Sequence, residues 1–185
     1  MTIALPPAER AVQLLGNDLT DKSLRLNLEG LPGVDAVGLE QRAAGLATRS
    51  IKTTSKRWAL DRIIELIDLT TLEGADTPGK VRSLVAKAMN PDPSDPTTPR
   101  VAAVCVYGDK VPDAVAALGA AHGDPDDGLI SVAAVATAFP SGRASLRVKL
   151  QDTADAVAAG ADEIDMVIDR GAFLAGRYGQ VFEEI

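Results

Sequence analysis

One acidic side chain inside an apolar run is the first candidate for chemistry in this sequence. Asp165 lies in Gly160–Ile168, where isoleucine, valine and methionine follow a glycine. Such a run predicts a parallel strand buried on both faces, and an unpaired carboxylate is costly there. A carboxylate at such a buried position is expected to form an ion pair or to take part in chemistry. The alternative interpretation is that Asp165 only accepts hydrogen bonds from backbone amides at the end of a strand.

The other residue types that often carry catalysis are scarce. Cys105 is the only cysteine and His122 the only histidine among the 185 residues. One chain can therefore build neither a disulfide framework nor a zinc site of cysteine and histidine ligands. His122 lies in a polar, glycine-rich turn, which argues against a histidine-based triad. We therefore expect no zinc site of this kind.

Composition and charge limit the possible partners. The chain is one domain by size, and 46% hydrophobic and 24% charged residues are typical of a soluble globular protein. A net charge of -7 and a pI near 4.7 argue against a nucleic-acid partner, because a phosphate-binding surface needs clustered lysine and arginine. No apolar run approaches the roughly 18 residues that span a bilayer, and the first residues lack the order of a signal peptide. We expect a cytoplasmic protein with no membrane partner.

The N-terminal part is expected to be less regular than the rest. Prolines and glycines interrupt residues 1–35, which we interpret as a loosely packed N-terminal arm outside the main domain at 36–185. Apolar residues at helical spacing follow at 37–50, and Ser55 could cap a second helix. These two helices are expected to flank one end of the fold.

Short apolar runs that alternate with amphipathic segments predict parallel strands and helices. The first helix after a strand has Thr77 as its expected N-cap and Pro78 at its first position. The prolines at 91–99 predict an exposed loop, and residues 169–176 are expected to form another loop before a last helix. The expected strands are 66–69, 101–106, 129–136 and 162–168, and the expected helices between them are 78–88, 111–121 and 145–159.

The spacing of these strands distinguishes between two α/β folds. Successive strands begin about 35, 29 and 32 residues apart, close to the roughly 31 residues per unit of an eightfold (β/α) barrel. No Gly-x-Gly-x-x-Gly follows the first strand, which argues against a dinucleotide-binding fold but leaves a flavodoxin-like sheet open. The pattern favours a parallel (β/α) TIM-type barrel, of which about four units are present after a helical leader.

The sequence contains four motifs that belong together: Asp68–Leu72, Ala103–Tyr107, Val135–Gly142 and Gly160–Ile168. In their order and spacing, these motifs resemble the deoxyribose-phosphate aldolases. The resemblance extends from about Gly38 to the end of the chain, so residues 1–35 lie outside it. It implies the N-terminal half of a TIM barrel and a class I aldolase that uses no metal and no cofactor. Such an enzyme cleaves 2-deoxy-D-ribose 5-phosphate to D-glyceraldehyde 3-phosphate and acetaldehyde in deoxynucleoside catabolism.

The resemblance also implies roles for individual residues. Asp165 matches the catalytic aspartate that relays protons while the carbinolamine forms and breaks down. Asp68 matches a second acid at the same mouth, which would place Asp165 and a catalytic lysine through hydrogen bonds, although it could also only cap backbone amides. Thr70 and Cys105 match substrate-binding positions that line the pocket, and Cys105 could equally be a small buried hydrophobic residue.

The lysines that class I chemistry needs are not expected in this chain. In the family the Schiff-base lysine lies on the sixth strand and the activating lysine on the seventh, and late loops hold the phosphate. Four lysines present here, Lys80, Lys87, Lys110 and Lys149, lie on helices expected to cover the outside of the barrel, where solvated helix faces explain them. The chain alone is therefore expected to be inactive.

Three hypotheses remain open from the sequence. The first is an aldolase whose second half is missing from this chain, with a small phosphorylated sugar as substrate and a possible homo-oligomer. The second is a half-barrel interaction protein or pseudo-enzyme that acts through a partner chain. The third is an unrelated phosphate-handling barrel or sheet protein that shares only the strand around Asp165.

Overall fold

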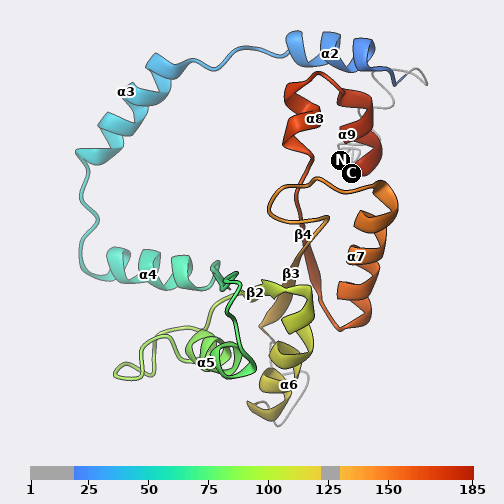
Figure 1. Ribbon diagram of the computed structural model, residues 1–185. Helices are drawn as coiled ribbons and strands as arrows, with labels where there is room; N and C mark the ends of the chain where they lie inside the picture. The colour runs from blue at the N-terminus through green and yellow to red at the C-terminus, as the bar shows by residue number, and fades with distance from the viewer. Residues whose placement is uncertain (1–18, 122–129) are drawn as a thin grey trace, which may run out of the picture. The chain divides into compact units, whose positions relative to one another are not determined.

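The computed structural model describes residues 19–121 and 130–185, so His122 and its expected turn lie outside the described residues. The chain divides into two compact units. The larger unit, Ile51–Val167, contains the parallel sheet and the helices between its strands (Figure 1). The smaller unit combines the residues up to Ser50 with Ile168–Ile185 and is helical in its described part.

The larger unit is built on a four-stranded parallel sheet with the order β1-β2-β3-β4. Each strand pairs with the next strand along the chain, which is the arrangement of successive (β/α) barrel units. The predicted partial barrel of four parallel strands is therefore confirmed. The strands are β1 (Asp68–Thr70), β2 (Ala103–Tyr107), β3 (Ser131–Ala136) and β4 (Glu163–Met166).

Helices follow the strands at the predicted places. α5 begins after Thr77, whose side chain accepts a hydrogen bond from the Lys80 amide at 3.3 Å, and Pro78 takes the first helical position, as predicted. The expected cap at Ser55 is wrong, because α4 already begins at Thr53 with Lys52 as its N-cap. The helices of this unit are α4 (Thr53–Ile64), α5 (Pro78–Met89), the short η1 (Gly108–Lys110), α6 (Val111–Ala121) and α7 (Leu146–Ala158).

Side chains alternate between the two faces of the sheet, and the described helices of the larger unit cover only one of these faces. On this outer face, valines such as Val104 and Val132 form a core with apolar residues of α5, α6 and α7. The opposite, inner face carries a smaller cluster of Cys105, Ala133 and Val135, against which Leu72, Tyr107 and Phe139 pack.

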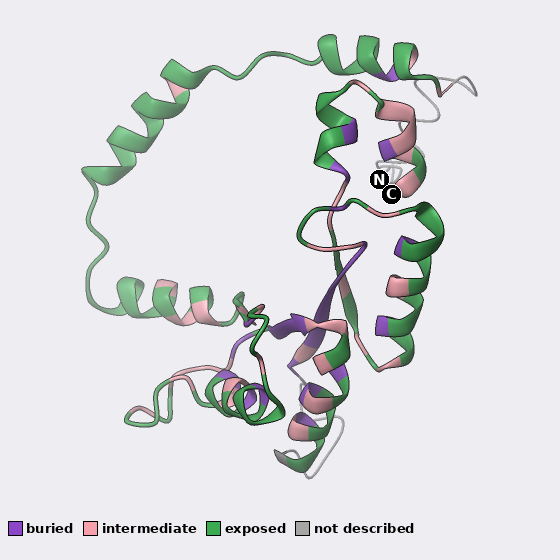
Figure 2. Ribbon diagram, viewed as in Figure 1, coloured by how far each residue is buried: buried purple, intermediate pink, exposed green. Residues whose placement is uncertain are grey.

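Burial differs between the central and the outer strands (Figure 2). β2 and β3 are buried almost throughout, as predicted for strands covered on both faces. The same prediction is wrong for β1 and β4, whose residues are exposed or half-buried. Within the described ranges each of these two strands has one neighbouring strand only, so one edge and part of the inner face stay open.

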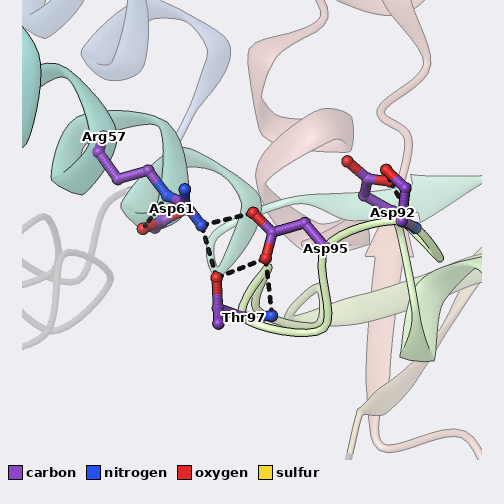
Figure 3. A network of polar contacts seen from close by, with 6 residues as sticks. Arg57, Asp61, Asp92, Asp95 and Thr97 are labelled. Atoms are coloured by element: carbon purple, nitrogen blue, oxygen red, sulfur yellow. Dashed lines mark hydrogen bonds and ion pairs between the residues drawn. The ribbon is translucent and has the colours of Figure 1, made fainter.

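An ion-pair network joins α4 to the proline-rich loop between α5 and β2 (Figure 3). Arg57 donates to Asp95 at 2.8 Å and to Thr97 at 2.6 Å, and its Nε lies 3.4 Å from the Asp61 carboxylate. The hydrogen bond and the charge of Asp95 raise the pKa of Arg57. Because Arg57 remains half exposed, this network adds little to the free energy of folding. Its main effect is to hold the loop against α4. The predicted irregular loop at 91–99 is confirmed.

The smaller unit contains two helices that the sequence did not predict. α2 (Asp21–Glu29) lies within the expected loose arm and begins with a capping box between Thr20 and Ser23. α8 (Arg170–Leu174) lies in the expected loop at 169–176, because Asp169 accepts a hydrogen bond from the Ala172 amide at 2.9 Å and acts as N-cap. The predicted helices α3 (Ala36–Ala47) and α9 (Tyr178–Glu184) are present.

Within this unit α2 packs against α9. Asp21 accepts a hydrogen bond from the Gly179 amide at 2.6 Å, and the Arg25 guanidinium lies 5.8 Å from the centroid of the Tyr178 ring. The Tyr178 ring meets Phe173 of α8 edge to face at 5.2 Å. These contacts hold residues 21–29 in place, so this part of the expected loose arm is an ordered helix. None of the helices in the described ranges is long and apolar enough to cross a membrane.

Candidate active site on the inner face of the sheet

The register of the sheet places the four predicted site residues on the same face. Thr70 is the partner of Cys105, and Asp68 lies two residues before Thr70, so all three side chains share the inner face. Asp165 is the partner of Val135, which belongs to the inner-face cluster with Cys105. Residues almost 100 positions apart in the sequence therefore meet on one surface.

The closest contact in this group joins Cys105 to Asp165. The Cys105 thiol is 1% exposed and donates a hydrogen bond to Oδ2 of Asp165 at 3.5 Å. Burial first, and then the charge of Asp165 and its hydrogen bond, together raise the pKa of Cys105 to about 12, and a hydrogen bond with Thr70 opposes them. The thiol is thus protonated near pH 7 and serves as a buried donor, not as a nucleophile.

The carboxylates of the group are more accessible than the sequence predicted. Asp165 and Asp68 are both exposed in the described structure, although Asp165 was expected in a strand covered on both faces. The reason is their position on β4 and β1, which are the outer strands of the sheet. The negative charge of Asp68 also acts on the Cys105 thiol, which places both carboxylates around the same sulfur atom.

The end of β1 is fixed by side-chain and backbone hydrogen bonds. The Thr70 hydroxyl donates to the Asp68 carbonyl oxygen at 2.9 Å. The next residue, Thr71, is buried, and its amide donates to the Cys105 carbonyl oxygen at 3.1 Å. Its hydroxyl donates to the Asp76 carboxylate at 3.0 Å. The position of Thr70 beside Cys105 therefore depends on contacts beyond the strand itself.

The segment after β3 adopts an unusual backbone conformation. Thr137 and Ala138 both have φ of 61°, a region that side chains other than glycine rarely occupy. The Thr137 hydroxyl accepts from the Val167 amide and donates to the Val167 carbonyl, both at 2.8 Å, which extends the pairing beyond β4. Asp152 accepts from the Ala138 amide at 3.1 Å. Strained backbone of this kind concentrates at functional sites.

A cleft of about 430 Å³ opens beside this segment, at the carboxyl ends of β2 and β3. The rings of Tyr107 and Phe139 meet in it edge to face at 6.1 Å. Three aspartates line it, of which Asp109 is paired with Lys110 at 2.6 Å. Such a lining offers hydrogen-bond acceptors to hydroxyl groups. The lining residues are Tyr107, Gly108, Asp109, Val135, Ala138, Phe139, Asp152, Asp155 and Ala156.

Sequence reasoning assigned no role to Tyr107 or Asp109. A signal for both was present, since Tyr107 ends a buried strand and Asp109 follows it, and α/β proteins place their ligands at the carboxyl ends of strands. Asp152 gave no comparable signal, because it lies within an amphipathic helix, and only the fold brings it next to Ala138.

The four lysines considered in the sequence lie on helical elements outside the sheet, as predicted, but not all are solvated. Lys80 and Lys87 are exposed on α5, and Lys110 of η1 is partly covered. Lys149 is only 2% exposed, so its predicted solvated position is wrong. It lies seven residues before the buried Ala156, and two helical turns place both on the side of α7 that faces the sheet.

Comparison with known proteins supports the resemblance. No family model matches the chain. The deoxyribose-phosphate aldolase of Mus musculus is 40% identical over 150 residues, which cover 75% of this chain and 45% of that protein. The enzyme of the same name from Homo sapiens is 39% identical over 145 residues, which cover 72% and 44%. The chain thus spans less than half the length of these curated relatives.

Solved structures agree with these relatives. The crystal structure of a candidate deoxyribose-phosphate aldolase from Coccidioides immitis matches with a TM-score of 0.56 and 28% identity, covering 68% of this chain and 43% of that one. A structure from Toxoplasma gondii, with a TM-score of 0.54 and 23% identity, supports the fold alone. In sequence and in fold, the chain is therefore a relative of the deoxyribose-phosphate aldolases and forms a partial barrel with four parallel strands.

Proposed function

We propose that the protein is a class I aldolase that cleaves 2-deoxy-D-ribose 5-phosphate to D-glyceraldehyde 3-phosphate and acetaldehyde. In this proposal residues 36–185 form the N-terminal half of the barrel, and residues 1–35 lie outside it. The observation that carries the proposal is the grouping of Asp68, Thr70 and Asp165 around the Cys105 thiol, on strands whose motifs match the aldolases.

Asp165 is the proposed proton relay. Its carboxylate is exposed to the open inner face, where it can exchange protons with a substrate, and the Cys105 thiol orients it through one oxygen atom. The other oxygen stays available for the proton. Asp68 is the proposed second acid, and Thr70 and Cys105 line the pocket between them.

The covalent step of such an enzyme requires a lysine from outside these 185 residues. An imine forms only from a neutral amine, and lowering the usual lysine pKa of about 10.4 takes burial and a nearby cation. Among the described lysines, Lys80 pairs with Asp76 at 2.6 Å, and Asp109 raises the pKa of Lys110. Lys87 is exposed, and Lys149 lies on a helix of the outer face. We propose that this chain alone has no retro-aldol activity.

The test compares this chain with the product of the complete reading frame. Each is incubated with deoxyribose 5-phosphate or acetaldehyde and reduced with borohydride, and the modified lysine is located by mass spectrometry. We expect cleavage and a single adduct only in the complete product, on a lysine outside these residues. No cleavage by the complete product would refute the aldolase, and a stoichiometric adduct on Lys149 with turnover would refute the half-enzyme.

A second proposal is a half-barrel that acts with a partner chain. It is favoured by β1 and β4, each of which has a free edge within the described residues. Sedimentation at micromolar concentration tests it, first alone and then with a fragment that supplies further strands. Complex formation with recovery of activity supports pairing, and a stable monomer that ignores the fragment contradicts it.

A further inference from the structure

A buried carboxylate follows β1 and has no part in the proposed chemistry. The Asp76 side chain is only 3% exposed and lies in the connection between β1 and α5. It accepts hydrogen bonds from the Thr71 hydroxyl and the Glu73 amide, both at 3.0 Å. Its ion pair with Lys80 has a distance of 2.6 Å. Two residues of the connection and one residue of α5 thus converge on one side chain.

These contacts keep Asp76 charged. The hydrogen bond from Lys80 lowers its pKa most, and the Glu73 amide and the Thr71 hydroxyl lower it further against the opposing effect of burial. Hydrogen bonds to a charged acceptor are about twice as strong as those between neutral groups. The contact between Asp76 and Thr71 is therefore a strong local restraint.

Thr71 transmits this restraint to the candidate site. It follows Thr70 directly, and its amide donates to the carbonyl oxygen of Cys105. β1 has only three residues and pairs with β2 alone among the described strands, so few ladder bonds hold it. Short outer strands open locally at low free energy unless their ends are fixed.

We propose that Asp76 is a positioning residue, which holds Asp68 and Thr70 of β1 against Cys105 through its hydrogen bond with Thr71. The importance of this placement for catalysis rests on the proposed function. The placement itself is a property of the fold, so it can be tested without any activity.

The only cysteine of the chain is a suitable reporter. Because Cys105 is 1% exposed, a reagent such as iodoacetamide reacts with it only when the sheet opens locally. The amide of Thr71 is a second reporter, since its hydrogen exchange requires the bond to Cys105 to break. Both rates are measured on the intact chain under native conditions.

The test compares Asp76→Ala with a matched control, Asp92→Ala. Asp92 also accepts bonds from a backbone amide and a hydroxyl, both of Ser94, at 2.9 Å and 2.6 Å, but it lies in the loop after α5. We expect Asp76→Ala to accelerate Cys105 alkylation and Thr71 exchange by about tenfold, as the loss of a buried charged acceptor implies. Asp92→Ala is expected to leave both rates unchanged.

Two further variants keep the test decisive if Asp76→Ala does not fold. Thr71→Val removes the hydroxyl and should accelerate Cys105 alkylation as well, and Asp76→Asn should act in the same direction with a smaller effect. In the double variant Thr71→Val/Asp76→Asn, the two effects should not add, because both act through one contact.

Two results would overturn the inference. One is an unchanged rate of Cys105 alkylation in Asp76→Ala, Asp76→Asn and Thr71→Val. The other is an equal acceleration of exchange at the amides of β3, which would make Asp76 a contributor to overall stability and not a positioning residue. In the complete protein, Asp76→Asn should lower turnover more than substrate affinity. If that protein proves inactive towards deoxyribose 5-phosphate, the aldolase proposal fails, whereas the alkylation and exchange rates still decide the placement of β1.

Discussion

The central strands of the sheet, β2 and β3, differ from its outer strands, β1 and β4, in burial and in the residues they carry. Val104, Val106 and Ala134 of the central pair are 0% exposed and belong to the main core. The outer pair carries the candidate carboxylates Asp68 and Asp165, and both are exposed. The comparison shows that in this unit stability is concentrated at the centre of the sheet and the candidate chemistry at its sides.

The central and the outer strands are connected through Cys105. This central residue hydrogen-bonds to Asp165 through its thiol and to Thr71 through its carbonyl oxygen. The rigid centre can therefore fix carboxylates that have few supports of their own. Substitutions in the two pairs of strands should consequently have different effects.

The largest expected effect is on the core, from Val104→Asp. It places a carboxylate among apolar side chains where no partner is available, at a cost of several kcal/mol, and natural domains have only about 5–15 kcal/mol of stability. We expect the cooperative thermal transition to disappear in circular dichroism. Met166→Asp on β4 is the matched control, because Met166 is 38% exposed and should tolerate the charge. Equal losses in both variants would contradict the division between the strands.

The next effect is on turnover, from Asp165→Asn in the complete protein. Loss of a proton relay should reduce turnover at least about 100-fold, with little change in substrate affinity. The melting temperature should hardly change, because Asp165 is exposed. Glu163→Gln, two residues earlier on the same strand and face, is the control and should remain active. Unchanged turnover of Asp165→Asn would remove the catalytic assignment.

A smaller effect is expected on the self-association of the 185-residue chain. Because β1 and β4 each have one neighbour in the described structure, their free edges should make the 185-residue chain self-associate or bind a hydrophobic dye. Met166→Lys should weaken both, since a lysine on an outer strand opposes edge pairing, whereas Val148→Lys on α7 should not. A monomer that melts sharply and ignores the dye would show that the open edges have no consequence.

The smallest effect is on the titration of Cys105. With a pKa of about 12, its thiol should stay protonated well above pH 9, where an unperturbed cysteine already loses its proton. Asp165→Asn removes one negative charge and one hydrogen bond to the thiol, so the pKa should fall, but only partly, because burial is the larger cause. The Cβ chemical shift of ¹³C-labelled cysteine measures this. Glu163→Gln should leave it unchanged, and an equal shift in both variants would argue against the contact with Asp165.

The sequence by itself determined the order of the elements in the larger unit. The apolar runs of β2 and β3, the cap at Thr77 and the helical spacing of α6 and α7 depend on neighbours within a few residues, so they could be predicted locally. The four motifs likewise identified the related enzymes before any contact was known.

Only the tertiary structure decided which of these residues are buried and which of them meet. Lys149 and Asp165 show this, because a lysine expected in water is buried and an aspartate expected in the core is exposed on an outer strand. The link from Asp76 through Thr71 to Cys105 was also invisible in the sequence. Burial and long-range hydrogen bonds depend on which elements pack against each other, and periodicity within one element carries no information about its neighbours.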